Sequence, residues 1–142
     1  MIKQIKYKKN IFAYIFKITN KNGVNFFTPK KITQQVGILN HKKGHKINPH
    51  IHFKNPRKIA YTTEVLIILK GKVRVDFFNK QKKYLFSKIL KENDIIMLVH
   101  GAHGFKVVKK VQMLEIKQGP YINKLDKIKF NEIDESKIKI KK

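Results

Sequence analysis

The sequence predicts an all-β protein, an antiparallel sandwich or barrel, and three observations support this. Segments rich in β-branched and aromatic residues recur along the chain. Turn signals separate them, among them Asn55-Pro56, Lys70-Gly71 and Gly119-Pro120. No stretch of about ten or more residues shows a convincing helical repeat of apolar positions, which argues against alternating helices and strands.

The first predicted element is a hairpin. The segment from Ile11 to Ile18 is aromatic and β-branched, and Asn22-Gly23 is of the kind that closes a tight turn into Val24 to Phe27. Further strands are expected at Gln35 to Leu39, His50 to Phe53, Thr63 to Leu69, Lys72 to Phe78, Ile95 to Val99, Phe105 to Val108 and Gln112 to Lys117.

Length and composition favour one compact domain. The chain has 142 residues, 42% of them hydrophobic and ten of them Phe, which is enough for a real core. We expect an N-terminal hairpin at about 1–34, a core at about 35–120 and a C-terminal edge strand or tail at about 121–142. The absence of Cys excludes disulfides, a thiolate nucleophile and a cysteine-based zinc site.

The charge is strongly positive, with 33 Lys and Arg against nine Asp and Glu and a formal net charge of +24. Only Arg57 and Arg74 are arginine, and the lysines are spread along the whole chain. Specific nucleic-acid readers usually rely on the bidentate fork of Arg, so codon bias explains the lysines better than a dedicated nucleic-acid surface. A non-specific attraction to polyanions and a preference for anionic ligands are still expected.

No membrane partner is expected. The longest apolar runs, Ile11 to Phe16 and Val65 to Leu69, fall far short of the roughly 20 residues needed to cross a bilayer. Among the first residues, Lys side chains are scattered between apolar ones, so this stretch does not resemble a signal peptide. A cytoplasmic location is therefore the default expectation.

The six histidines cluster between positions 41 and 103. His50 and His52 are two residues apart in a strand-like segment and would point to the same side. Glu64 is the only charged residue of an apolar strand, where a carboxylate is costly unless it is paired or coordinated. His103 lies in a turn between Gly101 and Gly104. Each residue taken alone is an ordinary surface or turn residue, but together they indicate a metal site of three imidazoles and one carboxylate.

The spacing of these residues resembles the cupin family. Gly44 precedes His50 and His52 as in the first cupin motif, and Glu64 precedes Gly71 as in its second half. Asn93-Asp94, a following apolar strand, Gly101 and His103 resemble the second motif. The gap between His52 and Glu64 is longer than is usual in the family, and Val99 stands where the family has Pro.

The resemblance covers roughly residues 35 to 120 and implies a double-stranded β-helix, the jelly-roll barrel of the cupins. It implies a homodimer as well. The predicted ligands His50, His52, Glu64 and His103 suit one divalent ion of Fe, Mn, Ni, Co or Zn. The string Leu114 to Tyr121, with Asp126-Lys127 beyond it, is similar to a subgroup of small cupins that accompany surface-polysaccharide synthesis.

Four further residues are candidates for the site. Met113, Glu115 and Lys117 share one face of a predicted strand, and that face points either into the barrel, where Glu115 and Lys117 would do acid-base work or bind an anion, or out to solvent. Tyr121 caps the opening or simply packs. Arg57 either holds a phosphate or carboxylate or is a solvated loop residue.

These observations favour a metal-binding cupin that binds or acts on a small anionic or polyhydroxylated molecule, such as a sugar or nucleotide-sugar. As an enzyme it would be an isomerase, lyase, hydrolase or dioxygenase. Three alternatives remain open. The protein is a non-catalytic binder that uses the same pocket, or a metal-free nucleotide-sugar ketoisomerase with His50 and His52 as acid and base, or a polyanion-binding protein driven by its net charge.

Overall fold

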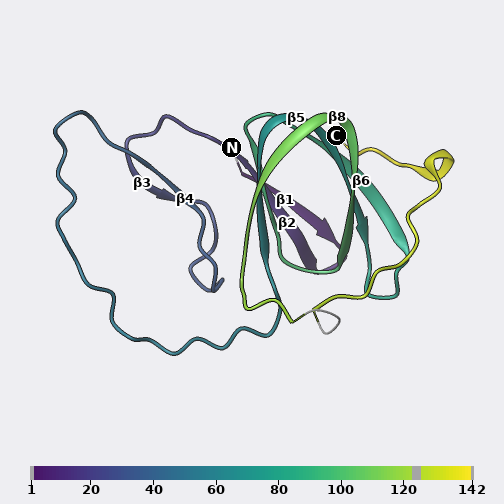
Figure 1. Ribbon diagram of the computed structural model, residues 1–142, viewed down its shortest axis with the longest axis horizontal. Coiled ribbons are helices and arrows are strands. Elements are labelled where there is room, and N and C mark those ends of the chain that lie inside the picture. Colours follow the sequence, from purple (N-terminus) through teal and green to yellow (C-terminus); the bar gives the residue numbers. More distant parts are fainter. Residues whose placement is uncertain (1, 123–125, 142) are drawn as a thin grey trace.

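The protein is built from β-strands, as the sequence predicts. The computed structural model describes residues 2–122 and 126–141, so Met1, Lys142 and part of the predicted C-terminal tail, residues 123–125, lie outside it (Figure 1). The strands are β1 (Ile2–Tyr7), β2 (Asn10–Lys17), β3 (Gly23–Phe26), β4 (Gly37–Asn40), β5 (Glu64–Phe78), β6 (Tyr84–Lys91), β7 (Asp94–Leu98) and β8 (Ala102–Lys117), followed by a short 3-10 helix, η2 (Glu135–Lys137).

Six strands form one curled antiparallel sheet, a half-barrel. Their order is β1-β2-β7-β5-β6. The strand β8 pairs with the edge of β5 opposite to the one that β7 and β6 share. The first half of β5 lies between β7 and β8, whereas its second half lies between β6 and β8. The long strands β5 and β8 therefore curl together around the sheet (Figure 1).

The bend of β5 occurs at Gly71, which has φ +88°. A Cβ added at this position would lie 1.9 Å from the carbonyl oxygen of Lys110 on β8. The β5–β8 register shifts on both sides of this point. Only glycine combines this left-handed backbone with so close an approach of the neighbouring strand.

Alternation along the strands divides the apolar residues between two faces. Leu66, Ile68, Val73 and Val75 of β5 join the inner core, together with Phe86 of β6. Val65 and Ile67, which alternate with them before the bend, belong to an outer cluster, which residues of the 27–36 segment cover. The outer cluster contains Tyr14, Phe16, Val65, Ile95 and Met97, with Phe27, Ile32, Val36 and Ile67 packed against it.

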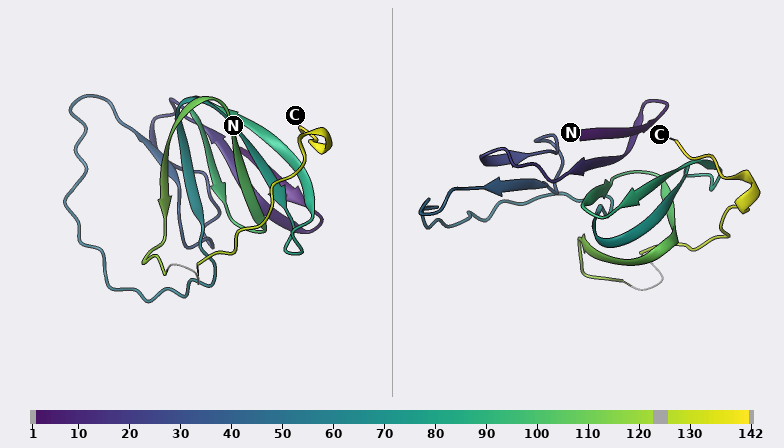
Figure 2. Two further views of the ribbon diagram at one scale, coloured as in Figure 1. Left: turned by 45° about the vertical axis from the view of Figure 1, so that its right-hand side comes forward. Right: turned by 90° about the horizontal axis from the view of Figure 1, so that it is seen from above.

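Two elements extend away from the half-barrel. The strands β3 and β4 form a separate two-stranded sheet. Residues 41–62, which we call the arm, form no strand and are all exposed. Figures 1 and 2 show the β3–β4 hairpin and the arm projecting beside the curled sheet.

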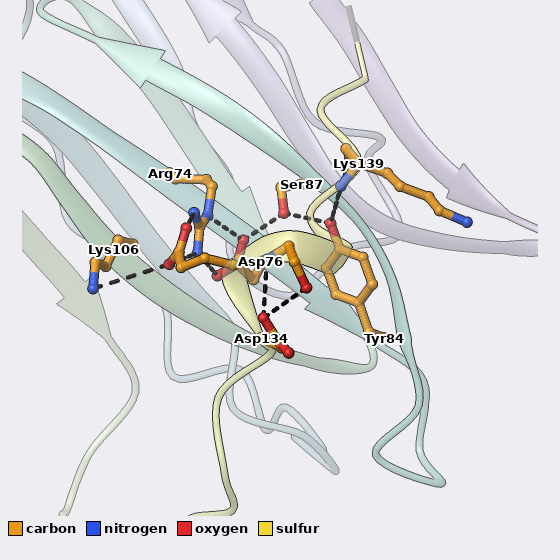
Figure 3. A network of polar contacts seen from close by, with 9 residues as sticks. Arg74, Asp76, Tyr84, Ser87, Lys106, Asp134 and Lys139 are labelled. Atoms are coloured by element: carbon orange, nitrogen blue, oxygen red, sulfur yellow. Dashed lines mark hydrogen bonds and ion pairs between the residues drawn. The ribbon is translucent and has the colours of Figure 1, made fainter.

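The C-terminal segment is clamped to the outer side of β5 and β6 (Figure 3). Arg74 donates to both carboxylate oxygens of Asp76, at 2.7 and 3.0 Å, and to both of Glu135, at 2.6 and 2.9 Å. Ser87 donates to Asp76, and the Lys139 amide donates to the Tyr84 hydroxyl at 2.9 Å. The carboxylates beside Arg74 raise its pKa, so this clamp is charged at every physiological pH.

Several sequence predictions need correction. The predicted hairpin of Ile11 to Ile18 with Val24 to Phe27 is wrong, because β2 pairs with β1 and β7 while β3 pairs with β4. The predicted strand at His50 to Phe53 is wrong as well, since this segment has no ladder partner. The strands expected on either side of Gly71 are one bent strand, and those expected between Phe105 and Lys117 are also one.

Substituting Gly71→Ala is expected to lower the free energy of unfolding by about 3 kcal/mol, because it adds left-handed strain to a clash with backbone. Urea denaturation measures this. Gly44→Ala is the matched control, because Gly44 has a similar φ of +86° but nothing within 4 Å of an added Cβ. Equal effects of the two substitutions would contradict a special role for the bend.

A second prediction concerns Lys88, which lies opposite Val75 on the inner face and is 6% exposed. Burial, and then the neighbouring Lys3, lower its pKa to about 8, against 10.5 for an ordinary lysine. Between these values the unfolded chain keeps a proton that the folded protein has released, so the free energy of unfolding should rise with pH in this window. Urea denaturation from about pH 8 to pH 10.5 should show a smaller rise for Lys88→Met than for the wild type, with the exposed Lys80→Met as control. Identical pH dependence in all three proteins would count against this assignment.

Candidate functional site

A carboxylate and an imidazole meet on the inner side of the half-barrel. The Nε2 of His103, near the start of β8, donates to the Oε2 of Glu64, the first residue of β5, at 2.9 Å. Along the β5–β8 ladder the two residues lie far apart, since Glu64 is opposite Lys117 and His103 is opposite Phe77. The bend of β5 therefore creates this pair.

The pair is only partly covered. The side chain of Glu64 is 17% exposed and that of His103 is 27% exposed. The hydrogen bond from His103 lowers the pKa of Glu64, burial opposes this, and the positive charges of His103, Lys117 and Lys127 lower the pKa further. Glu64 is thus an ionised carboxylate held at the end of a buried strand, where solvent or a ligand can still reach it.

The polar face of β8 points inward. Met113 packs against the inner core, whereas Ile116 lines a groove on the outer side together with Val65. Glu115 and Lys117 lie on the same face of β8 as Met113. Of the two orientations that the sequence leaves open, the structure therefore has the inward one. Lys117 lies 3.6 Å from Glu115 and its Nζ lies 5.6 Å from the centre of the Tyr121 ring.

An apolar wall adjoins this polar end. Phe105 lies opposite Val75 of the inner core, so its ring is on the inner face of β8. The ring is 5.4 Å from that of His103 and is 39% exposed. This end of the inner face thus carries charged residues beside a partly exposed aromatic ring.

A latch of uncharged polar groups fixes the start of β5. The amide of Thr63 donates to Gln118 at 2.8 Å, Gln118 donates back to the Thr63 hydroxyl at 2.8 Å, and the Thr63 hydroxyl also contacts Gln34. Sequence reasoning missed these residues, because one threonine and two glutamines from three distant segments form no motif. The latch holds the backbone of Glu64 and marks the point where the arm joins the half-barrel.

His50, His52 and Arg57 lie on the exposed arm, away from the Glu64–His103 pair. The rings of the two histidines are 5.0 Å apart, His50 Nδ1 is 3.0 Å from the carbonyl oxygen of Asn48, and Arg57 donates to the carbonyl oxygen of Asn55 at 3.2 Å. The structure therefore brings together Glu64 and His103 but not the four predicted ligands. The physical reason is that the arm has no ladder partner that would hold it against the sheet.

The four predicted ligands do not converge on one point within the described residues. Within residues 2–122 and 126–141, no three His, Asp or Glu side chains lie close enough together to hold a metal. Glu64 Oε2 and His103 Nε2 lie 2.9 Å apart in a hydrogen bond, so Nε2 would have to lose its proton before both atoms could bind one ion. The other two imidazoles would have to come from the arm, and this requires the arm to move.

Comparison with protein-family models, with curated proteins and with solved structures gives no match for this chain. In the described part of the chain, no helix is both long enough and apolar enough to cross a membrane.

The hydrogen bond between His103 and Glu64 predicts how the pKa of Glu64 responds to substitution. In His103→Leu the carboxylate of Glu64 loses its hydrogen bond but remains partly buried, so its pKa should rise. Lys117→Met should raise this pKa less, because Lys117 acts only through its charge. Carbon-detected NMR of the Glu64 carboxyl during a pH titration measures both effects. A Glu64 pKa that does not change in His103→Leu would show that the two side chains do not interact in solution.

Proposed function

We propose that this chain is a cupin-type jelly-roll protein that binds and acts on a small oxygen-rich molecule, such as a sugar or nucleotide-sugar, at the inner end of its half-barrel. The observation that carries the proposal is the hydrogen-bonded pair of Glu64 and His103. It stands on the concave side of the sheet beside Lys117 and Phe105, which offer a positive charge and an aromatic ring to a ligand.

The pair is suited to proton transfer. An imidazole that donates one ring N–H to a carboxylate has its orientation and tautomer set, and its other nitrogen is available to accept or deliver a proton. Glu64 would orient His103 and stabilise the imidazolium as it forms. Such a group moves protons at a carbon next to a carbonyl or at a hydroxyl, which is the chemistry of sugar isomerases and lyases.

The positive charges define the class of ligand. Lys117 lies on the inner face, and Lys127 is near enough to affect Glu64. With a net charge of +24 the chain attracts anions before they dock. Lys117 would therefore hold a phosphate or carboxylate of the ligand, while Phe105 would pack against its ring.

One divalent ion belongs to the proposal. Glu64 and His103 would supply two of its ligands, and His50 and His52 would supply the others once the arm folds over the half-barrel. A bound ion would polarise a carbonyl or hydroxyl of the ligand. A metal-free ketoisomerase is the second candidate. In it His103, oriented by Glu64, would take the acid–base role that the sequence assigns to His50 and His52, because these two histidines lie on the exposed arm; the observation that favours it is the direct contact of Glu64 with His103.

Metal analysis and ligand binding together distinguish the metal-binding protein from the metal-free ketoisomerase. Protein purified without chelator is analysed for metal, and nucleotide-sugar binding is then measured by calorimetry before and after chelation. The metal form predicts about one ion per chain, lost in Glu64→Gln, His103→Asn, His50→Ala and His52→Ala. The metal-free form predicts binding that chelation does not change and that only Glu64→Gln and His103→Asn weaken, by about ten-fold or more.

Glu92→Gln is the control, because it removes one exposed carboxylate in the turn between β6 and β7. Product analysis by NMR then distinguishes turnover from binding alone, and saturable binding without product would support the non-catalytic alternative. If sugars and nucleotide-sugars bind wild type, Glu64→Gln and His103→Asn equally well, the proposed site is wrong.

A further inference from the structure

Two histidines at the start of the arm, His41 and His45, stack on each other. Their ring planes are 2° from parallel and the ring centroids are 4.0 Å apart. Both residues are exposed, and they belong to the arm that projects beside the curled sheet (Figures 1 and 2). Neither belongs to the proposed site around Glu64 and His103, so two imidazoles in contact have no role in it.

A tight turn holds the two rings together. The amide of His45 donates to the carbonyl oxygen of Lys42 at 3.1 Å. Gly44 occupies the third position of this turn with φ +86°, the left-handed backbone that a type II turn requires there. The chain therefore reverses between His41 and His45. The turn does here what a helix does elsewhere, which is to bring two histidines four residues apart to the same side.

The available side chains decide which ion such a pair would take. Residues 1–63 contain no Asp, Glu or Cys. Ca²⁺ and Mg²⁺ need carboxylate oxygens, so this part of the chain does not suit them. Imidazole nitrogen suits Cu²⁺, Ni²⁺ and Zn²⁺. Two imidazoles would leave the other positions of such an ion to water or to an anion.

We propose that His41 and His45 together bind one divalent transition ion, Cu²⁺, Ni²⁺ or Zn²⁺, at the start of the arm. Each imidazole would offer one ring nitrogen, and because both side chains are exposed they can rotate from the stack to face one ion. The site uses no residue of the proposed Glu64–His103 site and does not depend on the proposed function. With only two protein ligands it would lose its ion during purification, so it would not add to the metal content expected of that other site.

The lysines around the pair oppose binding in a way that can be measured. Lys42, Lys43 and Lys46 flank the two histidines and repel a cation. These lysines are exposed, so salt screens their charge within about 8 Å at physiological ionic strength. The affinity for a divalent cation should therefore rise with salt. A polyanion attracted by the net charge of +24 would show the opposite dependence.

The second histidine pair of the arm is arranged less favourably. The rings of His50 and His52 are 5.0 Å apart and lie at 78° to each other. These two residues already belong to the ion of the proposed function. An ion held by them would not depend on His41 or His45, and this difference is what the experiment uses.

Calorimetric titration with Cu²⁺ tests the site in a protein that carries His50→Ala and His52→Ala, which removes the other histidines of the arm. This background protein should still bind Cu²⁺, and more tightly as sodium chloride is added. His41→Asn or His45→Asn in the same background should weaken binding about ten-fold or more, because one imidazole alone cannot chelate the ion. Loss of the ion proposed at Glu64 and His103 would leave these results unchanged, so the two proposals fail separately.

The turn offers a matched pair of variants in the same background. Gly44→Val removes no ligand, but it places a β-branched residue at a positive φ, so it should open the turn and weaken Cu²⁺ binding several-fold. Gly44→Asn should bind as the background protein does, because Asn tolerates this backbone. Equal affinities of the two variants would contradict a site that this turn positions.

NMR of the imidazole protons provides a readout in the wild type. Cu²⁺ is paramagnetic, so substoichiometric Cu²⁺ should broaden the signals of His41 and His45 before those of His100, whose ring packs edge-on against Phe12 at 5.5 Å. The proposal is overturned if Cu²⁺ leaves the signals of His41 and His45 sharp, if loss of either histidine does not change the affinity, or if the affinity falls as salt is added.

Discussion

The bend of β5 at Gly71 is the constraint on which the rest of the structure depends. A straight strand would have one set of neighbours, whereas the bent strand pairs with β7 before the bend and with β6 after it. The strand β8 follows both halves and is curled by them. The curl gives the sheet an inside, and it brings Glu64 and His103 within hydrogen-bonding distance although the ladder alone would keep them apart.

Two charged clusters on β5 differ in how many of their hydrogen-bonding groups are already used. Arg74 is buried, and its bonds to Asp76 and Glu135 use both oxygens of each carboxylate. Such a saturated network fixes the C-terminal segment and leaves little for a ligand. The Glu64–His103 pair faces the concave side, is joined by a hydrogen bond and is still reached by solvent. The pair therefore keeps bonding capacity that the network around Arg74 has used up.

The chain combines a high positive net charge with exposed apolar side chains on the β3–β4 hairpin. Lysines scattered over the surface attract anions from a distance but give little geometric specificity. The hairpin and the groove beside it carry the apolar surface that the half-barrel does not cover.

The sequence by itself determined the all-β class, most strand positions from Thr63 onward, a change of direction at Gly71 and the need of the Glu64 carboxylate for a partner. These follow from local alternation, from glycine's conformational range and from the cost of a lone carboxylate in a core strand. Only the tertiary structure decided that β2 pairs with β1 and β7 rather than with β3, that Glu115 and Lys117 face inward, and that His50 and His52 lie on an arm. Pairing partners, the buried side of a strand and the position of a long loop depend on contacts between distant segments, and local patterns do not encode those contacts.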